Sequence, residues 1–441
     1  MSRNTDLLQR SLAAVWHPCT QMQQHAAAVD VLPLLPIERA EGVWLYDFDG
    51  RRLFDGISSW WVNLLGHGHP AVNAAIREQL QTLEHVMLAG FTHEPVVQLS
   101  EQLAQLAPGK LGHCFYGSDG ASAIEIALKM SFHYWRNQGH TDKTRFLALR
   151  NSYHGETLGA LSVTDIPLFR STYAELLRAV DQVPSPDWRL ADPGESAEDY
   201  ALRCAATLEA HLQQHAAQTA AFIVEPLVQC AGGMAMYHAA YLRRAAALCR
   251  QYQVHLIADE IAVGFGRTGS MFACEQADVA PDFLCLSKGI TGGYLPLSVV
   301  MTTDAVYAAF YDPSLSRGFL HSHSYTGNPL ACRAALAVLA VLIGEQRIAR
   351  NIGLRDWMNR RIASWHAHPG ITQLRNTGMI WAFELTDTRA DAGARFHRQA
   401  LQQGILLRPI GRTVYWMPPY AVDEETLEFL AAGIERVLDA G

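Results

Sequence analysis

A lysine and an aspartate, each placed directly after a short apolar run, are the residues of this chain whose types and spacing best suit chemistry. The first run, residues 255–258, ends in Asp259, and the second, residues 283–286, is followed by Ser287 and Lys288. Short apolar runs bounded by polar residues and glycine predict buried parallel strands. Ligands bind at the carboxyl ends of such strands in open α/β sheets. We therefore expect Asp259 and Lys288 to face one crevice.

An amine and a carboxylate in one crevice match the needs of pyridoxal phosphate. The aldehyde of this cofactor forms an imine with a lysine, and a carboxylate keeps its ring nitrogen protonated so that the ring accepts electrons. Either residue alone is explained as well by a solvated loop charge or a helix cap. The hypothesis therefore depends on the pair.

The elements that must position this pair follow from the periodicity. Short apolar strands alternate with helical patterns between residues 110 and 300, which predicts an α/β fold with a mainly parallel central sheet. From residue 347 onward, helices and short strands predict a smaller α+β domain. We expect residues 1–60 to form an N-terminal arm and part of the small domain, 61–330 the large cofactor-binding domain, and 331–441 the C-terminal small domain.

Composition narrows the class of partner. The 441 residues, 49% hydrophobic and 18% charged, predict a large core, and a net charge of −8 without basic clusters argues against nucleic-acid binding. Eight scattered cysteines without a Cys-x-x-Cys pair are typical of reduced thiols. The longest apolar run, 334–344, is shorter than the roughly 20 residues that span a bilayer. We expect a cytoplasmic protein that acts on small molecules, with no membrane partner.

A turn of small residues suggests a phosphate site. Residues 117–122 lie between a predicted strand, 113–116, and a predicted helix, 123–135. Free backbone N–H groups at such a helix start hold phosphate. An ordinary cap by Asp119 explains the same pattern equally well.

Two further residues follow predicted strands. Tyr153 lies beyond the strand 145–149 and beside a glycine, where it could stack on a planar ring or simply fill the core. Glu225 ends the strand 221–224. The tandem Trp60 and Trp61 could likewise be core anchors or the wall of a pocket for an aliphatic substrate.

Two motifs point to chemistry that we do not expect. Residues 264–269 match the dinucleotide pattern G-x-G-x-x-G, but five residues separate them from their strand and no amphipathic helix follows. The closely spaced histidines at 67 and 69, and at 321 and 323, have no acidic or cysteine partner at ligand spacing. We predict neither a dinucleotide site nor a metal site.

Taken together, residues 222–226, 258–261, 264–269, 287–289 and 326–329 resemble motifs of the fold-type I, class III aminotransferases, which use pyridoxal phosphate. The resemblance covers nearly the whole chain. It implies that Lys288 bonds to the cofactor and moves the reacting proton, with its pKa lowered by burial, that Asp259 pairs with the pyridine nitrogen, and that Tyr153 stacks on the ring. It also implies a homodimer, because His323 and Ser324 would reach the neighbouring subunit's phosphate. The other implied cofactor-binding residues are Asp119, Gly120, Ala121 and Glu225.

A second group of motifs, residues 16–22, 58–61, 407–409 and 415–420, resembles one branch of that family. The resemblance implies transfer of the amino group of S-adenosylmethionine to 8-amino-7-oxononanoate in biotin biosynthesis. Arg408 would bind a substrate carboxylate through a bidentate contact. The other residues implied in substrate binding are Cys19, Trp60, Trp61, Tyr153, Arg267, Lys288, Ser322 and Tyr415.

Two departures from relatives bear on these expectations. Cys19 stands where some relatives have a tyrosine, which leaves lysine open as the amino donor, and Glu156 stands where relatives have an aspartate. One alternative is a broad-specificity ω-amino acid or diamine aminotransferase, which the tandem tryptophans and Arg408 disfavour. Another is a non-catalytic scaffold relative, which the presence of both Lys288 and Asp259 disfavours.

Overall fold

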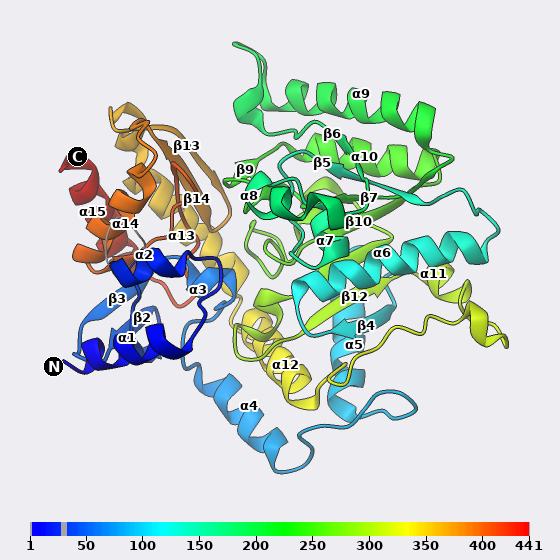
Figure 1. Ribbon diagram of the computed structural model, residues 1–441, viewed down its shortest axis with the longest axis horizontal. Helices are drawn as coiled ribbons and strands as arrows, with labels where there is room; N and C mark the ends of the chain where they lie inside the picture. Colours follow the sequence, from blue (N-terminus) through cyan, green and yellow to red (C-terminus); the bar gives the residue numbers. More distant parts are fainter. Residues whose placement is uncertain (1, 28–32, 441) are drawn as a thin grey trace. The chain divides into compact units, whose positions relative to one another are not determined.

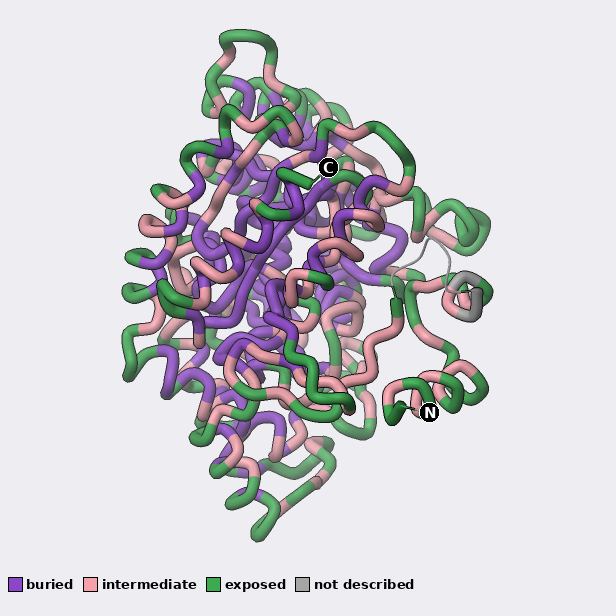
Figure 2. The backbone as a smooth tube through the Cα atoms, turned by 90° about the vertical axis from the view of Figure 1, so that its left-hand side faces the viewer, coloured by how far each residue is buried: buried purple, intermediate pink, exposed green. Residues whose placement is uncertain are grey.

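The computed structural model describes residues 2–27 and 33–440. The chain divides into two compact units, and each is described by itself. The small unit comprises Met1–Pro70 and Ala349–Gly441, and the large unit comprises Ala71–Ile348. In Figure 2 the buried stretches, coloured purple, run through the interior, and the exposed stretches follow loops and outer helix faces.

The large unit is built on a seven-stranded sheet in the order β4-β12-β11-β10-β7-β5-β6. Only β12 is antiparallel to its neighbours, so the expected α/β fold with a mainly parallel sheet is confirmed. The central strands are buried at every position, which explains why they read as continuous apolar runs rather than as alternating patterns. The strands are β4 (His113–Gly117), β5 (Arg145–Leu149), β6 (Asp181–Val183), β7 (Thr219–Val224), β10 (His255–Asp259), β11 (Phe283–Leu286) and β12 (Ser298–Thr302).

Helices cover this sheet (Figure 1). Helix α6 (Gly120–Asn137) packs along β7, β10, β11 and β12, and α9 (Ala197–His215) and α10 (Ala239–Gln251) lie side by side. The remaining elements of the large unit are α4 (Pro70–Leu80), α5 (Glu94–Leu106), α7 (Leu158–Val163), α8 (Pro167–Arg170), η1 (Ser171–Leu176), η2 (Trp188–Leu190), β8 (Val228–Gln229), β9 (Ala235–Met236), η3 (Ala273–Ala277), η4 (Lys288–Thr291), α11 (Asp304–Ala308), η5 (Leu315–Arg317) and α12 (Pro329–Gly344).

The small unit contains two sheets, in the orders β1-β2-β3-β15 and β13-β14-β16. A turn at Asp49 and Gly50 joins β2 (Trp44–Asp47) to β3 (Arg52–Asp55) as an antiparallel hairpin. Its other elements are α1 (Arg3–Ala14), α2 (Met22–Ala27), β1 (Ile37–Glu41), α3 (Ser58–Trp61), α13 (Arg347–Arg361), η6 (Ala363–Ala367), β13 (Ile371–Thr377), β14 (Ile380–Leu385), α14 (Ala392–Gln402), β15 (Ile405–Leu406), β16 (Thr413–Trp416) and α15 (Glu424–Asp439).

The units divide at 70/71 and 348/349, whereas the expected domain boundaries lie at 60/61 and 330/331. The second difference has a packing cause. Helix α12 lies just beyond the expected boundary, but it packs on α5 and η4 within the large unit. Its side chains Val338 and Leu339 are fully buried, so the helix belongs to the large core.

Among the described residues, no single helix is long and apolar enough to cross a membrane. One bent pair, α12 with α13, passes the same test of length and composition.

Lys143 joins its own segment to two others, at 216–219 and at Gln253, at the amino-terminal side of the sheet. Its Nζ donates hydrogen bonds to the carbonyl oxygens of Ala216 (2.8 Å), Thr219 (3.0 Å) and Gln253 (2.7 Å). We expect Lys143→Met to lower the free energy of unfolding by about 2–4 kcal/mol, because it leaves these carbonyl groups without their donor. Urea denaturation measures the change. The exposed control Lys110→Met should unfold like the wild type, and equal stability of both variants would contradict the role of Lys143.

Candidate active site

Three ionisable side chains follow three adjacent strands of the large unit. Glu225 follows β7, Asp259 ends β10 and Lys288 follows β11, and these strands pair in parallel as neighbours. The carboxyl ends of neighbouring parallel strands lie at one edge of the sheet. The fold therefore brings together the aspartate and the lysine that the sequence singled out.

The amine of Lys288 is held in surroundings that favour its neutral form. Burial lowers the pKa of Lys288, and the nearby Asp259, Cys230 and Glu225 oppose that shift. The residue as a whole is partly exposed. An amine with a lowered pKa is suited to nucleophilic attack and to proton transfer.

A histidine holds the carboxylate of Asp259, and sequence reasoning did not find it. His154 Nδ1 lies 2.7 Å from Asp259 Oδ2, and the backbone N–H of Ile261 donates to Oδ1 at 3.1 Å. Both side chains are buried. Because a carboxylate only accepts hydrogen bonds, Nδ1 of His154 carries the hydrogen. The imidazole thus fixes one oxygen of Asp259 and keeps its orientation.

Glu225 positions the chain at Tyr153. Its carboxylate accepts hydrogen bonds from the backbone N–H groups of Tyr153 (3.0 Å) and Cys230 (3.1 Å). Burial raises the pKa of Glu225 well above its usual value, and Asp259 raises it further. The Tyr153 hydroxyl donates to Glu156 at 2.8 Å. The Glu225 carboxylate therefore holds the backbone of Tyr153, and so fixes the point from which the tyrosine ring extends.

The turn before α6 combines a cap with a candidate phosphate site. Asp119 caps the helix, since its carboxylate accepts from the Ser122 N–H at 2.9 Å and the Ser122 hydroxyl at 2.8 Å. A phosphate at this turn would meet backbone groups such as those of Gly120 and Ala121, because a helix cannot satisfy its first N–H groups itself. The turn at Gly155 approaches closely: a Cβ there would lie 2.6 Å from the Cβ of Ala121.

The segment 321–324 lies partly against this turn. Both ring nitrogens of His323 are 3.5 Å from the Ser118 hydroxyl of the same chain, whereas Ser322 and Ser324 are exposed. His321 accepts a hydrogen bond from Lys129 Nζ at 2.8 Å. The histidines at 321 and 323 thus have side-chain partners in the fold, and no metal-ligating group of three occurs among the described residues.

The glycine-rich loop 264–269 is a buried connection. It follows β10 through a series of turns and leads into the short η3, not into an α-helix. Glu260 anchors it by accepting from the N–H groups of Ala273 (2.6 Å) and Cys274 (2.8 Å). Arg267 lies within the loop and is only 1% exposed. Its guanidinium is therefore part of the interior of the large unit.

The tandem tryptophans belong to a left-handed turn of the small unit. Ser58, Ser59, Trp60 and Trp61 have φ values of 50°, 46°, 71° and 71°. Left-handed conformations cost L-residues about 1–2 kcal/mol each, so the surrounding structure must enforce this turn. Trp61 is buried while Trp60 is 41% exposed. The Trp61 residue is therefore part of the core, whereas Trp60 remains partly open to solvent.

Arg408 and Tyr415 are the partners of these rings within the small unit. The Trp61 indole N–H donates to the Tyr415 hydroxyl at 3.1 Å, and the Arg408 guanidinium carbon lies 4.6 Å from the centre of the Trp60 ring. Cys19 lies in the N-terminal arm with an exposed side chain and a φ of 52°. The predicted substrate residues of this unit thus form two neighbouring pairs, and Pro18 and Thr20, on either side of Cys19, line the same cavity as Trp60 and Arg408.

Arg408, Trp60 and Ser59 line a cavity of about 340 Å³ in the small unit. Six of the twelve other lining residues are aliphatic, three are the histidines His17, His25 and His397, and Arg408 supplies a guanidinium. Such a cavity suits a ligand with an apolar chain and a carboxylate. The aliphatic lining residues are Leu34, Leu35, Ile37, Leu45, Ile57 and Leu406.

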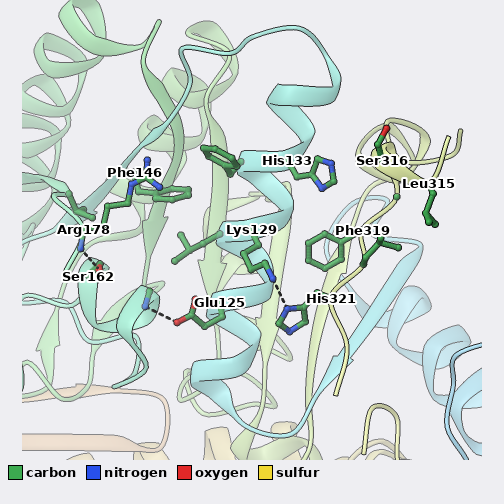
Figure 3. Close-up of a pocket in the computed structure, with 16 residues that line it drawn as sticks. Glu125, Lys129, His133, Phe146, Ser162, Arg178, Leu315, Ser316, Phe319 and His321 are labelled. Atoms are coloured by element: carbon green, nitrogen blue, oxygen red, sulfur yellow. Dashed lines mark hydrogen bonds between the residues drawn. The ribbon is translucent and has the colours of Figure 1, made fainter. Parts of the chain in front are cut away.

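Figure 3 shows a larger cavity, of about 560 Å³, beside α6 in the large unit. Lys129 and His321 point toward each other and are joined by the 2.8 Å hydrogen bond, and Glu125 accepts a hydrogen bond from the Gly159 N–H at 2.7 Å. None of the predicted cofactor-binding residues lines this cavity. We do not assign it to the reaction site.

The groups at the sheet edge fit pyridoxal phosphate. The large unit offers an amine of lowered pKa, a carboxylate fixed by a histidine, a tyrosine and a helix N-terminus that follows a strand. Together with the mainly parallel sheet, they define a pyridoxal-phosphate-dependent transferase of fold type I.

The chain belongs to the class III aminotransferases, because the sequence profile of the family Aminotransferase class-III matches residues 25–438. It is an aminotransferase with pyridoxal phosphate as its cofactor.

Relatives within the family are similar over their full length. The chain is 43% identical to adenosylmethionine-8-amino-7-oxononanoate aminotransferase of Helicobacter pylori, over 100% of this chain and 99% of the relative. The Synechococcus elongatus protein of the same name is 40% identical, over 96% and 98%.

Two solved structures extend the comparison. The structure of adenosylmethionine-8-amino-7-oxononanoate aminotransferase from Methanocaldococcus jannaschii has a TM-score of 0.92 at 32% identity, with 99% of each chain covered. The ω-transaminase from Pseudomonas jessenii in complex with PMP has a TM-score of 0.93 at 28% identity, with 98% of each chain covered.

The buried Glu260 makes stability depend on pH. Burial raises the pKa of Glu260 to about 7, above the value of 4.5 for an ordinary glutamate. Between these values the folded state keeps a proton that the unfolded state has lost, so the stabilisation from this proton is complete below 4.5 and is lost as the pH rises through about 7. We expect the free energy of unfolding of the wild type to fall by about 2–3 kcal/mol more than that of Glu260→Gln between about pH 5 and pH 8.

Urea denaturation of the cofactor-loaded protein at both pH values measures this difference. Glu101→Gln, a change of an exposed glutamate on α5, is the control and should follow the wild type. Parallel pH profiles of the wild type and Glu260→Gln would contradict the prediction.

Proposed function

We propose that this aminotransferase moves the amino group of S-adenosylmethionine to the ketone of 8-amino-7-oxononanoate and so forms 7,8-diaminononanoate in biotin biosynthesis. The observation that carries the proposal is the cavity of the small unit, which six aliphatic side chains line together with Trp60 and the adjacent Arg408 guanidinium. Its chemistry suits an acceptor with a long aliphatic chain and a terminal carboxylate. The names of the relatives support the same reaction.

In this proposal the large unit performs the amino transfer. Bound pyridoxal phosphate supplies an aldehyde that takes up the amino group and a ring that withdraws electrons. Lys288 holds the cofactor and carries the proton between the substrate carbon and the cofactor, for which a lowered pKa is suited. Asp259, oriented by His154, pairs with the ring nitrogen. Tyr153 stacks on the ring, and Glu225 sets the position of its backbone.

We assign phosphate binding to the start of α6, at Asp119, Gly120 and Ala121. The Asp119 carboxylate contributes by capping the helix, and the backbone N–H groups contact the phosphate. His323 and Ser324 of a second copy would complete the site.

Arg408 binds the acceptor carboxylate, Trp60 forms an apolar wall, and Trp61 holds Tyr415 through its indole N–H. We assign further substrate contacts to Cys19, Tyr153, Arg267, Lys288 and Ser322.

The proposed assembly is a homodimer. Four large apolar side chains of the segment 311–325 are exposed, namely Tyr311 (79%), Leu315 (73%), Leu320 (71%) and Tyr325 (65%). Contiguous exposed apolar side chains mark interaction surfaces. This segment also contains His323 and Ser324, which favours a second copy as its partner.

We propose the cytoplasm as the compartment of this enzyme. All eight cysteines are free thiols, and six of them are buried. Reduced cysteines are typical of cytoplasmic proteins.

A broad-specificity ω-amino acid or diamine aminotransferase remains the second candidate, since ω-transaminases share this fold. Lysine as the amino donor is a variant of the first proposal, because Cys19 offers no aromatic ring. The fold is common to these reactions, so only the substrates distinguish them.

Two half-reactions test the proposed function. We expect S-adenosylmethionine to bleach the long-wavelength absorbance of the cofactor-loaded enzyme, and 8-amino-7-oxononanoate to restore it. Lysine and a simple ω-amine, offered in parallel as donors, test the two alternatives.

Lys288→Ala should lose about a thousandfold or more in overall turnover, because it removes the group that moves the proton.

Stopped-flow absorbance follows both half-reactions. If only the ω-amine bleaches the band and 8-amino-7-oxononanoate does not restore it, the proposed reaction is wrong. Bleaching by lysine but not by S-adenosylmethionine would retain the acceptor and replace the donor.

Arg408→Ala should raise the KM for 8-amino-7-oxononanoate about 30-fold, since a charge-assisted contact to a carboxylate contributes roughly 2 kcal/mol. The cofactor absorbance should not change, because Lys288 and Asp259 lie in the large unit. Steady-state kinetics and absorbance spectra measure both effects. Arg412→Ala, a change of an exposed arginine in the same segment, is the control. An unchanged KM in Arg408→Ala would contradict the assignment.

A further inference from the structure

A buried carboxylate lies beneath the left-handed turn Ser58–Trp61. Asp55 is fully buried, and its Oδ1 accepts from the backbone N–H of Ser59 at 2.9 Å. Its Oδ2 accepts from the Ser59 hydroxyl at 2.7 Å and lies 2.9 Å from Nε2 of His67. Both oxygens of one carboxylate are therefore engaged by the turn and by one imidazole.

The protonation pattern of His67 follows from its neighbours. Asp55 only accepts hydrogen bonds, so Nε2 of His67 carries a hydrogen. Nδ1 of the neutral ring is then an acceptor, and it takes a hydrogen bond from the Asn63 side-chain amide at 2.9 Å. The backbone of His67 is fixed in turn, because it exchanges two hydrogen bonds with Gly42, at 2.7 and 2.9 Å. Asn63, His67 and Asp55 thus form a chain of hydrogen bonds with one direction.

This chain ends at a wall of the aliphatic cavity. Ser59, which gives both its N–H and its hydroxyl to Asp55, lines that cavity together with Trp60 and Arg408. Trp60 follows Ser59 directly in the left-handed turn, and its ring contacts the Arg408 guanidinium. None of the four turn residues is a glycine, so outside contacts must hold this conformation.

We propose that Asp55 and His67 are positioning residues that fix the left-handed turn and thereby set Trp60 against Arg408 for recognition of the acceptor's carboxylate and chain. The inference rests on the proposed function for the identity of the acceptor. Whatever the acceptor is, we expect the aliphatic cavity to bind a carboxylate well only while Asp55 holds Ser59.

A double-mutant cycle tests this role. We expect Asp55→Ala to raise the KM for 8-amino-7-oxononanoate about tenfold or more with less than about a threefold change in kcat. His67→Phe should act in the same direction, and Ser59→Ala, which removes a single hydrogen bond, should have a smaller effect. In the Arg408→Ala background, Asp55→Ala should add little, because the contact that it positions is already lost. Asp49→Ala, at an exposed turn, is the matched control.

Binding of nonanoate, a straight-chain carboxylate, provides a readout that does not need turnover. Calorimetry with the cofactor-loaded enzyme should show about tenfold weaker binding in Asp55→Ala and His67→Phe than in the wild type. A wild type that fails to use 8-amino-7-oxononanoate sinks the proposed function, and the positioning role is then judged on nonanoate alone.

Three results would overturn the inference. The first is equal nonanoate affinity in the wild type and His67→Phe. The second is additive effects of Asp55→Ala and Arg408→Ala on KM. The third is a loss of activity in Asp55→Ala that lowers kcat and leaves KM unchanged. If Asp55→Ala does not fold, Ser59→Ala and His67→Phe decide the matter, since each leaves the carboxylate with other donors.

Discussion

The structure depends on ionisable groups that are held where buried strands end. Lys288, Asp259 and Glu225 lie next to one another at the edge of a sheet whose central strands have no exposed residue. Burying a carboxylate is costly unless hydrogen-bond donors meet it. The fold supplies them: Glu225 accepts from two backbone N–H groups, and Asp259 accepts from a backbone N–H and an imidazole. These donors belong to the connections that follow β5, β7 and β10. The backbone path of these connections therefore determines the geometry of the site.

Much of this arrangement follows from local sequence. Strands that are buried on both faces appear as continuous apolar runs, and the residue after each run must lie at the carboxyl edge of a parallel sheet. This rule alone places Asp259 beside Lys288, and the strand at 145–149 has the expected bounds. By contrast, the helix expected at 123–135 runs from Gly120 to Asn137. Helix ends depend on tertiary packing more than on periodicity, which explains this difference.

Contacts between distant residues could not be predicted in the same way. His154 and Asp259 are 105 positions apart, and nothing near either residue indicates the pair. The left-handed turn at the tryptophans is a stronger case, because serine and tryptophan have no local preference for positive φ. Only the completed small unit, with Asp55 below the turn and the Met417 carbonyl accepting from the Ser58 hydroxyl at 2.6 Å, makes this conformation stable. The tandem tryptophans were therefore visible in sequence, but their geometry was not.

An aspartate and a histidine recur in both units, and the difference between the two pairs matches their different tasks. In the small unit, both ring nitrogens of His67 are engaged, by Asp55 and by Asn63, so the hydrogen-bond chain has one arrangement. In the large unit, Nδ1 of His154 meets Asp259, while Nε2 is buried without a hydrogen-bond partner among the described residues. The proposed role of Asp55 and His67 is to support a wall of the aliphatic cavity, and a single hydrogen-bond arrangement suits that role. In the proposed function Asp259 faces the cofactor ring, and an imidazole bound through one nitrogen orients this carboxylate without competing for its other oxygen. Under that assignment the same two residue types serve rigidity in one unit and electrostatics in the other.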